Sequence, residues 1–190
     1  RGIPGLAVIR PADAHETVHA MKAALSRTSG PTALILTRQD VPLIDQKKCS
    51  QAKGLERGGY VLWEAAKATP DVILLATGSE VNLVLEAAYT LGSEGVKVRV
   101  VSLPCWELFD AQCMDYRESV LPSGVRRRIA VEAGLRLGWE HYTGLDGIVI
   151  GMDHFGASAP AGVLYEKFGI TVEAIIQAAR TLLRKRGRPK

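Results

Sequence analysis

Apolar and polar positions follow two different periods along this chain, which indicates strands alternating with helices. An apolar run over residues 6–9 predicts a strand that ends at Arg10. Residues 13–27 then carry apolar side chains at helical spacing, with Asp13 placed to cap the helix. A second apolar run, 31–38, predicts the next strand. Because this strand–helix–strand unit is too small for a complete α/β domain, we expect it to be the end of one whose beginning is absent.

Residues 39–57 are polar and aperiodic, which predicts a linker laid over the surface. From Gly58 onward the alternation resumes, and residues 105–121 are expected to form a loop that contains aromatic side chains. The predicted strands are 60–63, 71–76, 96–101, 128–132 and 147–151, and the predicted helices are 80–94, 160–167 and 171–186. This order predicts an α/β fold with a three-layer, largely parallel (mixed) sheet and helices on both faces, preceded by a strand–helix–strand remnant.

Composition narrows the class of protein. The 190 residues are 47% hydrophobic and 23% charged, which is typical of a globular chain. No uncharged apolar run is long enough for a membrane span, and no secretory signal precedes the first strand. The three cysteines show no zinc-ligand spacing, so we expect reduced thiols and a cytoplasmic protein. Five positive charges fall in the tail from Arg184 to Lys190, which leaves the rest of the chain at −1 and gives no reason to expect nucleic acid as a partner.

Candidate chemistry is expected in the loops beyond the carboxyl ends of the strands, where open α/β sheets bind ligands. Arg10 stands at such a strand end, just before a helix. Its guanidinium could hold a phosphate or carboxylate, or it could tie two domains together by ion pairs. Residues Thr77 and Glu80 have the spacing of a capping box, and we interpret them as a helix cap rather than as an anion site.

Two further loops contain titratable side chains. Glu132 ends a predicted strand and is followed by His141, which would allow an acid–base pair, but we favour a packing or interface role. Asp153, His154 and Ser158 resemble a catalytic cluster in composition. Residues this close in sequence rarely converge as a triad, so we predict a turn in which Ser158 caps the next helix.

Eight segments, in this order, carry a resemblance to a known family. They begin with Val-Ile-Arg-Pro-Ala-Asp and include Asp-Val-Ile-Leu-Leu-Ala-Thr-Gly-Ser-Glu-Val and Tyr-Arg-Glu-Ser-Val-Leu-Pro. The eight segments are 8–13, 31–39, 58–62, 71–81, 98–104, 106–112, 116–122 and 155–160. Together they cover nearly the whole chain apart from the linker and the tail. The chain resembles the C-terminal part of transketolase, a thiamine-diphosphate enzyme of the pentose phosphate pathway.

The resemblance implies a domain division and a reaction. It divides the chain into a remnant of the pyrimidine-binding domain (1–45), a linker (46–57) and the C-terminal domain (58–190). Transketolases transfer a two-carbon ketol unit from a ketose phosphate to an aldose phosphate, and the cofactor performs the difficult chemistry. The resemblance further implies a homodimer, with thiamine diphosphate and magnesium bound in the full-length enzyme.

The resemblance carries over one site residue. Arg10 matches the arginine of the family's Arg-Pro-Ala-Asp block and is expected to contact the terminal phosphate of a sugar phosphate substrate. This favours the anion-binding role for Arg10. The family's metal-binding motif, the activating glutamate and the channel histidines have no match here. We therefore expect no catalytic, cofactor-binding or metal-binding residue in this chain, which should be inactive and bind no cofactor alone.

Alternatives from other classes stay open. The chain could be the same region of a related enzyme, dihydroxyacetone synthase or deoxyxylulose-phosphate synthase, although the segment 116–122 favours transketolase over the latter. It could also be a non-catalytic interaction or regulatory module. Residues 186–189 match the core of an AT-hook, a segment that lies in the minor groove of A·T-rich DNA. Because so short a match arises often by chance, we expect the basic tail to serve the helix dipole and solubility instead.

Overall fold

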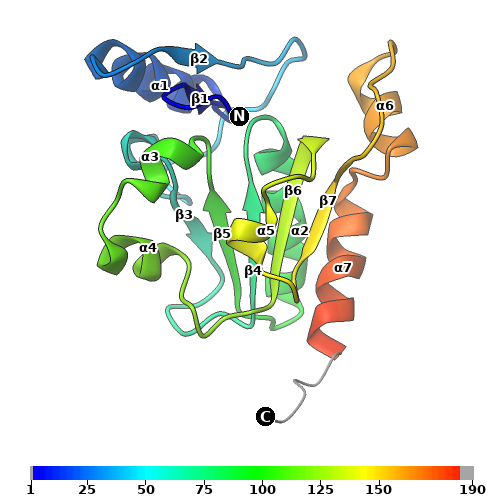
Figure 1. Cartoon of the computed structure of the whole chain (residues 1–190). Helices are drawn as coiled ribbons and strands as arrows, with labels where there is room; N and C mark the ends of the chain where they lie inside the picture. Colours follow the sequence, from blue (N-terminus) through cyan, green and yellow to red (C-terminus); the bar gives the residue numbers. More distant parts are fainter. Residues whose placement is uncertain (1, 185–190) are drawn as a thin grey trace.

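A computed structural model describes residues 2–184 of the chain, and it contains two packed units (Figure 1). The smaller unit is a parallel pair of strands with one helix, and the larger unit is a five-stranded sheet with helices on both faces. The strands are β1 (Ala7–Ile9), β2 (Thr32–Leu34), β3 (Tyr60–Glu64), β4 (Val72–Ala76), β5 (Val98–Ser102), β6 (Arg128–Leu135) and β7 (Ile148–Met152). The helices are α1 (Ala14–Ser26), the 3-10 helix η1 (Ala52–Arg57), α2 (Glu80–Ser93), α3 (Trp106–Asp110), α4 (Met114–Val120), α5 (Glu140–Thr143), α6 (Ala161–Lys167) and α7 (Val172–Arg184).

The larger sheet has the strand order β3-β5-β4-β6-β7, and only β3 runs antiparallel to its neighbour. Successive side chains of a strand point to opposite faces, so the central strand β4 supplies two cores. Leu74 packs in the core with α2 and α7, whereas Ile73 and Leu75 pack in the core with Phe109 and Trp139 from the opposite face. The expected mixed sheet with helices on both faces is therefore confirmed.

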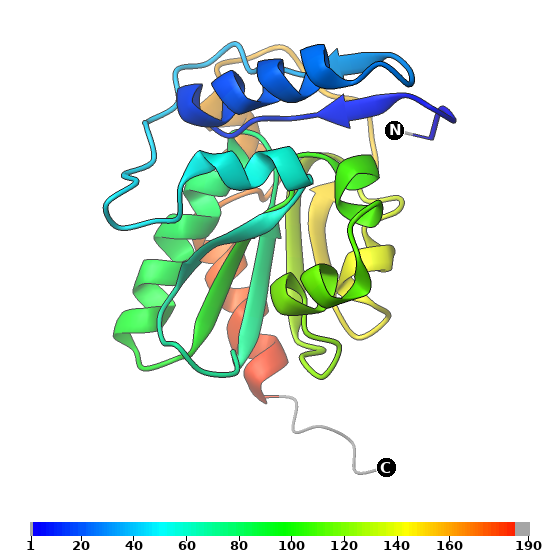
Figure 2. The same cartoon turned by 90° about the vertical axis from the view of Figure 1, so that its left-hand side faces the viewer.

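The smaller unit lies across one end of the larger sheet, at the carboxyl ends of its parallel strands (Figures 1 and 2). Backbone hydrogen bonds join the two units, since the N–H of Arg10 donates to the carbonyl of Pro104 at 3.0 Å. The N–H of Val8 in β1 also donates to the Glu107 carboxylate in α3 at 3.2 Å. The end of β1 is thus fixed against the loop and helix that follow β5.

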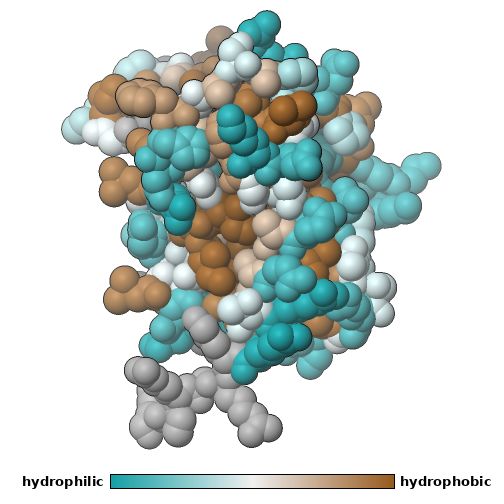
Figure 3. Space-filling view, turned by 90° about the vertical axis from the view of Figure 1, so that its right-hand side faces the viewer, coloured by the Kyte–Doolittle hydropathy of each residue, from teal (hydrophilic) through white to brown (hydrophobic). Residues whose placement is uncertain are grey.

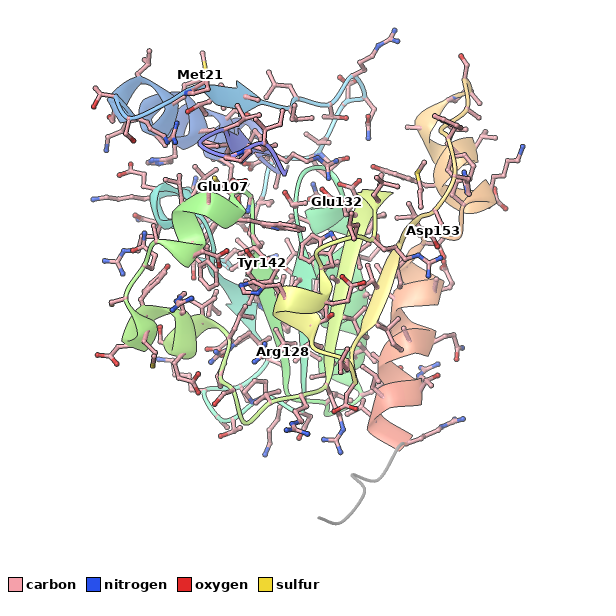
Figure 4. The ribbon with its side chains drawn as sticks, in the orientation of Figure 1. Met21, Glu107, Arg128, Glu132, Tyr142 and Asp153 are labelled. Atoms are coloured by element: carbon pink, nitrogen blue, oxygen red, sulfur yellow. The ribbon has the colours of Figure 1, made fainter. Side chains whose placement is uncertain are left out.

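The first strand–helix–strand unit forms as expected, with shorter strands. Asp13 caps α1 by accepting a hydrogen bond from the N–H of Glu16 at 2.9 Å. The predicted strand 31–38 is too long, because β2 pairs with only three residues of β1 and its ladder ends at Leu34. The apolar side chains expected to form a buried helix face also differ, since Val18, Met21 and Leu25 are exposed. Figure 4 shows Met21 on the outer side of α1.

Two further expectations from the sequence were wrong. The segment 39–57 does not lie only over the surface, because Ile44 is buried and Leu55 in η1 is completely buried. The segment 105–121 is not a continuous loop but contains the helices α3 and α4. These helices have five and seven residues, so each is too short to show a helical period in the sequence.

One edge of the larger sheet is formed by β7, whose five residues are all partly exposed. Figure 3 views the molecule from this side and shows apolar surface near the middle of the face, with polar groups around it. Within residues 2–184, none of the helices combines the length and apolar character needed to cross a membrane.

Candidate functional site

The candidate site lies where the chain changes direction across the larger sheet. From β4 the chain crosses to β5 on one side, and it later returns to β6 on the other side of β4. The carboxyl ends of β4 and β6 therefore form the crevice in which open α/β sheets bind ligands. Glu80, the first residue of α2, and Glu132, in β6, both lie at this crevice. Figure 4 shows Glu132 on the side of β6 that faces the smaller unit.

The smaller unit inserts Arg10 between these two carboxylates. The Nη1 atom of Arg10 donates to Oε1 of Glu132 at 2.8 Å, and its Nη2 atom lies 3.3 Å from both carboxylate oxygens of Glu80. The side chains of Arg10, Glu80 and Glu132 are 17%, 0% and 7% exposed. Of the two roles that the sequence left open for Arg10, the ion pair between units is the one that these contacts show.

The two carboxylates are themselves held in place. Oε1 of Glu80 accepts a hydrogen bond from the N–H of Ala133 at 2.8 Å, and Oε2 of Glu132 accepts one from the indole N–H of Trp139 at 2.7 Å. Burial lowers the pKa of Arg10, but the attraction of Glu80 and Glu132 outweighs it and raises the pKa overall. Arg10 therefore stays charged.

The backbone of Arg10 is fixed as firmly as its side chain. Its carbonyl accepts hydrogen bonds from the N–H of Gly78 at 3.0 Å and from Oγ1 of Thr77 at 3.1 Å. Gly78 has φ of +65°, and a Cβ atom on it would lie 3.0 Å from Nη2 of Arg10. Only glycine fits this turn without strain, because the turn combines a left-handed backbone with a close approach.

A second polar contact joins the two units in the interior. Glu16 on α1 is almost completely buried, and its Oε1 atom accepts hydrogen bonds from Tyr60 Oη at 2.9 Å and Ser102 Oγ at 2.6 Å. Its Oε2 atom accepts from the N–H of Ala12 at 2.8 Å. Burial raises the pKa of Glu16, and these hydrogen bonds offset only part of that effect. The smaller unit is thus joined to the larger sheet by the Glu16 carboxyl group, which accepts hydrogen bonds from Tyr60 and Ser102 of that sheet.

Several sequence interpretations of these loops are corrected by the structure. The expected capping box at Thr77 and Glu80 is wrong, because the N-cap of α2 is Ser79 and both predicted residues bind Arg10 instead. Ser158 does not cap the next helix, since the N-cap of α6 is Pro160. At Thr77 and Glu80 the tertiary contact with Arg10 replaces the capping bonds that the sequence spacing predicted, and the N-cap expected at Ser158 lies two residues later, at Pro160.

The remaining titratable candidates do not converge on one point. Glu132 and His141 form no acid–base pair with each other. Glu132 pairs with Arg10 across the two units, and His141 lies 3.5 Å from Asp110. Asp153 pairs with Arg136 at 2.7 Å, and His154 bonds to the carbonyl of the neighbouring Phe155. No triad is therefore formed.

Beside the Arg10 cluster is a hollow of about 350 Å³, a size in the range of small-molecule sites. The loop after β2 contributes Arg38 and Gln39, the start of α2 contributes Ser79, and α6 contributes Tyr165. Arg38 is exposed and forms no ion pair with any residue in the range 2–184. Sequence reasoning missed Arg38. The signal that could have found it is its position at the end of the predicted strand 31–38, which is the same argument that selected Arg10.

Within residues 2–184, the cysteines and the metal-ligating side chains form no further site. Cys49 and Cys105 are buried, Cys113 is exposed, and all three are free thiols. Among the described residues, His, Cys, Asp and Glu form no group of three or more that could hold a metal ion.

The chain is a two-part α/β protein. Its larger part is an open, mostly parallel sheet, and its smaller part is a strand–helix–strand unit that places Arg10 in the crevice at the carboxyl ends of β4 and β6. A model of the transketolase-like C-terminal domain matches residues 58–171, and a model of the transketolase pyrimidine-binding domain matches residues 1–43. The chain belongs to the transketolase family.

Individual relatives agree with this assignment. A transketolase from Geobacillus stearothermophilus is 45% identical over 97% of this chain, and a chloroplastic one from Craterostigma plantagineum is 47% identical over 96%. The solved transketolase from Leishmania mexicana superposes with a TM-score of 0.86 at 44% identity, covering 97% of this chain and 26% of that one. This chain spans 28% of the length of the Geobacillus relative and 35% of the Craterostigma one.

Proposed function

We propose that this chain is the C-terminal portion of a transketolase, which transfers a two-carbon ketol unit between ketose and aldose phosphates with thiamine diphosphate and magnesium. The observation that carries the proposal is the order of the two family matches, the pyrimidine-binding domain over residues 1–43 and the C-terminal domain over residues 58–171, in a chain that aligns with a transketolase over 97% of its length. Two solved relatives from Pichia stipitis are complexes with xylulose-5-phosphate and with sedoheptulose-7-phosphate, which supports sugar phosphates as substrates.

In the same proposal, residues 1–45 are the end of the pyrimidine-binding domain, 46–57 are a linker and 58–190 are the C-terminal domain. The exposed apolar side chains Val18 and Met21 on α1 support this division, because they suit a helix covered by the rest of that domain. A homodimer and a cytoplasmic location are part of the proposal, and the chloroplastic relative is a known exception to such a location. The basic tail lies beyond the described residues apart from Arg184, and we propose no nucleic-acid partner for it.

The residues described here do not fit the cofactor's metal, since no cluster of metal-ligating side chains occurs among residues 2–184. We assign no step of the reaction to the cofactor in this chain and no catalytic residue. That the isolated chain binds no thiamine diphosphate stays a prediction. Calorimetry of the 190-residue chain with the cofactor and magnesium tests it, and tight binding would refute it.

The contribution of this chain to substrate binding is a positive charge for the phosphate. The role predicted for Arg10 stays a prediction, but its guanidinium is already occupied by the carboxylates of Glu80 and Glu132. Arg38 is the arginine at the hollow whose charge is unmatched by any described carboxylate. A forked guanidinium binds phosphate through two parallel hydrogen bonds, so we propose Arg38 as the phosphate contact.

The experiment compares Arg10→Met with Arg38→Met in the full-length enzyme. Each variant is assayed with a phosphorylated ketose and with the same ketose lacking its phosphate. Loss of a phosphate contact should raise KM for the phosphorylated substrate by about ten- to a hundred-fold, since a charge-assisted hydrogen bond contributes about 1.5–3 kcal/mol. KM for the unphosphorylated substrate should not change. A selective effect of Arg10→Met alone would restore the role predicted from the sequence.

A further inference from the structure

Three side chains from three separate segments meet at the edge of the hollow. The Nε2 atom of Gln39, in the loop after β2, donates to Ser79 Oγ at 3.1 Å and to Tyr165 Oη at 3.2 Å. The two hydroxyl oxygens are 2.7 Å apart. We propose that this Gln39–Ser79–Tyr165 triad is a positioning device that holds the neighbouring Arg38 in place for the substrate phosphate. The inference rests on the function proposed above.

Gln39 has a defined orientation in the triad. Its Oε1 atom accepts a hydrogen bond from Thr37 Oγ1, and its NH₂ group faces the two hydroxyls. A primary amide has two donor hydrogens, one for each hydroxyl oxygen. Both N–H donors of the Gln39 amide are therefore used, one for Ser79 and one for Tyr165. The residue next to Arg38 is tied to the larger unit by its side chain, whereas Arg38 itself is exposed.

Ser79 gives up a local role to take part in the triad. It is the N-cap of α2, where a serine side chain normally accepts a hydrogen bond from the start of the helix. Here its side chain forms no capping bond. Its hydroxyl points instead to Gln39 and Tyr165, with a longer contact of 3.5 Å to Oε2 of Glu80. The side chain of Ser79 therefore stabilises tertiary structure rather than the helix end, because its partners Gln39 and Tyr165 lie 40 and 86 residues away along the chain.

Tyr165 joins a weakly attached helix to the same point. None of the seven residues of α6 is fully buried, so the helix has little apolar packing to hold it. Burial raises the pKa of Tyr165, and the phenol therefore keeps its proton as a hydrogen-bond donor. If Tyr165 donates to Ser79, then Ser79 can donate to Glu80, and the hydrogen bonds run in one direction from Gln39 to the Arg10 cluster.

The backbone explains why the loop needs this restraint. The last sheet-like hydrogen bond of the smaller unit is from the N–H of Ile35 to the carbonyl of Ile9, at 2.9 Å. Leu36, Thr37 and Arg38 beyond it are exposed. Gln39 is the next residue with a side-chain bond to the larger unit. Arg38 is thus held between a strand end and an amide anchor, and loss of the anchor would let the guanidinium move while its charge stayed the same.

The test uses the full-length enzyme with Gln39→Met and Tyr165→Phe, assayed with the phosphorylated and unphosphorylated ketose. Gln39→Met keeps the side-chain length and removes both anchor bonds, so KM for the phosphorylated ketose should rise by about ten-fold, the effect of two neutral hydrogen bonds. Tyr165→Phe removes one hydroxyl and should raise it by about three-fold. For both variants kcat and the KM of the unphosphorylated ketose should stay unchanged, because the reacting end of the substrate is not affected.

A matched control is Tyr89→Phe, which removes a tyrosine hydroxyl on the far part of α2 whose one hydrogen-bond partner within residues 2–184 is the Cys49 thiol, at 3.5 Å. It should leave both KM values unchanged. An equal change of KM for both substrates would overturn the inference, because it would indicate a general structural defect. Arg38→Met distinguishes the proposed phosphate contact of Arg38 from the positioning role of the triad. If it raises KM selectively and Gln39→Met does not, only the positioning role fails; if Arg38→Met has no effect, the proposed phosphate contact fails as well.

Discussion

The ion-paired joint at Arg10 makes a strong prediction about stability. Replacing Arg10 with Met keeps most of the side-chain volume but leaves Glu80, which is fully buried, and Glu132, which is 7% exposed, without their cation. Removing one partner of a buried ion pair costs about 3–5 kcal/mol, because the other charge stays buried and uncompensated. We expect Arg10→Met to lower the free energy of unfolding of the 190-residue chain by about this amount.

Equilibrium unfolding in urea, followed by the fluorescence of the three tryptophans, measures the change. Adding Glu80→Gln to Arg10→Met should recover part of the loss, since a neutral amide tolerates burial better than a carboxylate. Arg126→Met is a matched control, because Arg126 pairs with Asp146 at 3.6 Å and both side chains are largely exposed. It should have little effect. A loss below about 1 kcal/mol for Arg10→Met, or one that Glu80→Gln does not alter, would refute the reasoning.

Two other predictions concern titratable groups. Burial raises the pKa of Glu16 above its ordinary value of 4.5, so the folded chain holds this proton more tightly than the unfolded chain. This stabilisation is present at low pH and is lost as pH rises from 4.5 through the folded-state pKa. Glu16→Gln should therefore lose less unfolding free energy across that pH range, measured from urea midpoints. If the dependence of the unfolding free energy on pH is the same in Glu16→Gln as in the parent chain, the raised pKa of Glu16 is contradicted. Burial also raises the pKa of Cys105 to about 12, whereas Cys113 is exposed. An alkylating reagent at neutral pH should thus label Cys113 first, as peptide mass spectrometry would show, and preferential labelling of Cys105 in the native chain would count against its burial.

Much of the architecture could be predicted because it depends on local patterns. The strand β4 is a continuous apolar run, and α2 and α7 carry apolar residues at helical spacing, so their bounds were placed within a few residues. The helices α3 and α4 were missed because a helix of one or two turns has no measurable period. The burial of Leu55 was missed because its neighbours are polar, and only the packing against α1 and β3 explains it.

The candidate site shows the same division. Arg10 could be selected from its place after a strand, and both of its possible roles were visible in the sequence. Its partners were not, because Glu80 and Glu132 are 70 and 122 residues away along the chain. The sequence spacing of Thr77 and Glu80 even predicted that Glu80 caps a helix, whereas in the structure its carboxylate pairs with Arg10.

By itself, the sequence determined the order of the strands and of the longer helices, the family and the arginine at the first strand end, because these depend on nearest neighbours and on short segments. The tertiary structure decided which charges meet. The fold brings Arg10 between two carboxylates and leaves Arg38 unmatched among the described residues, and the interaction of charges depends on their separation in space and on burial. Neither quantity can be obtained from positions along the chain.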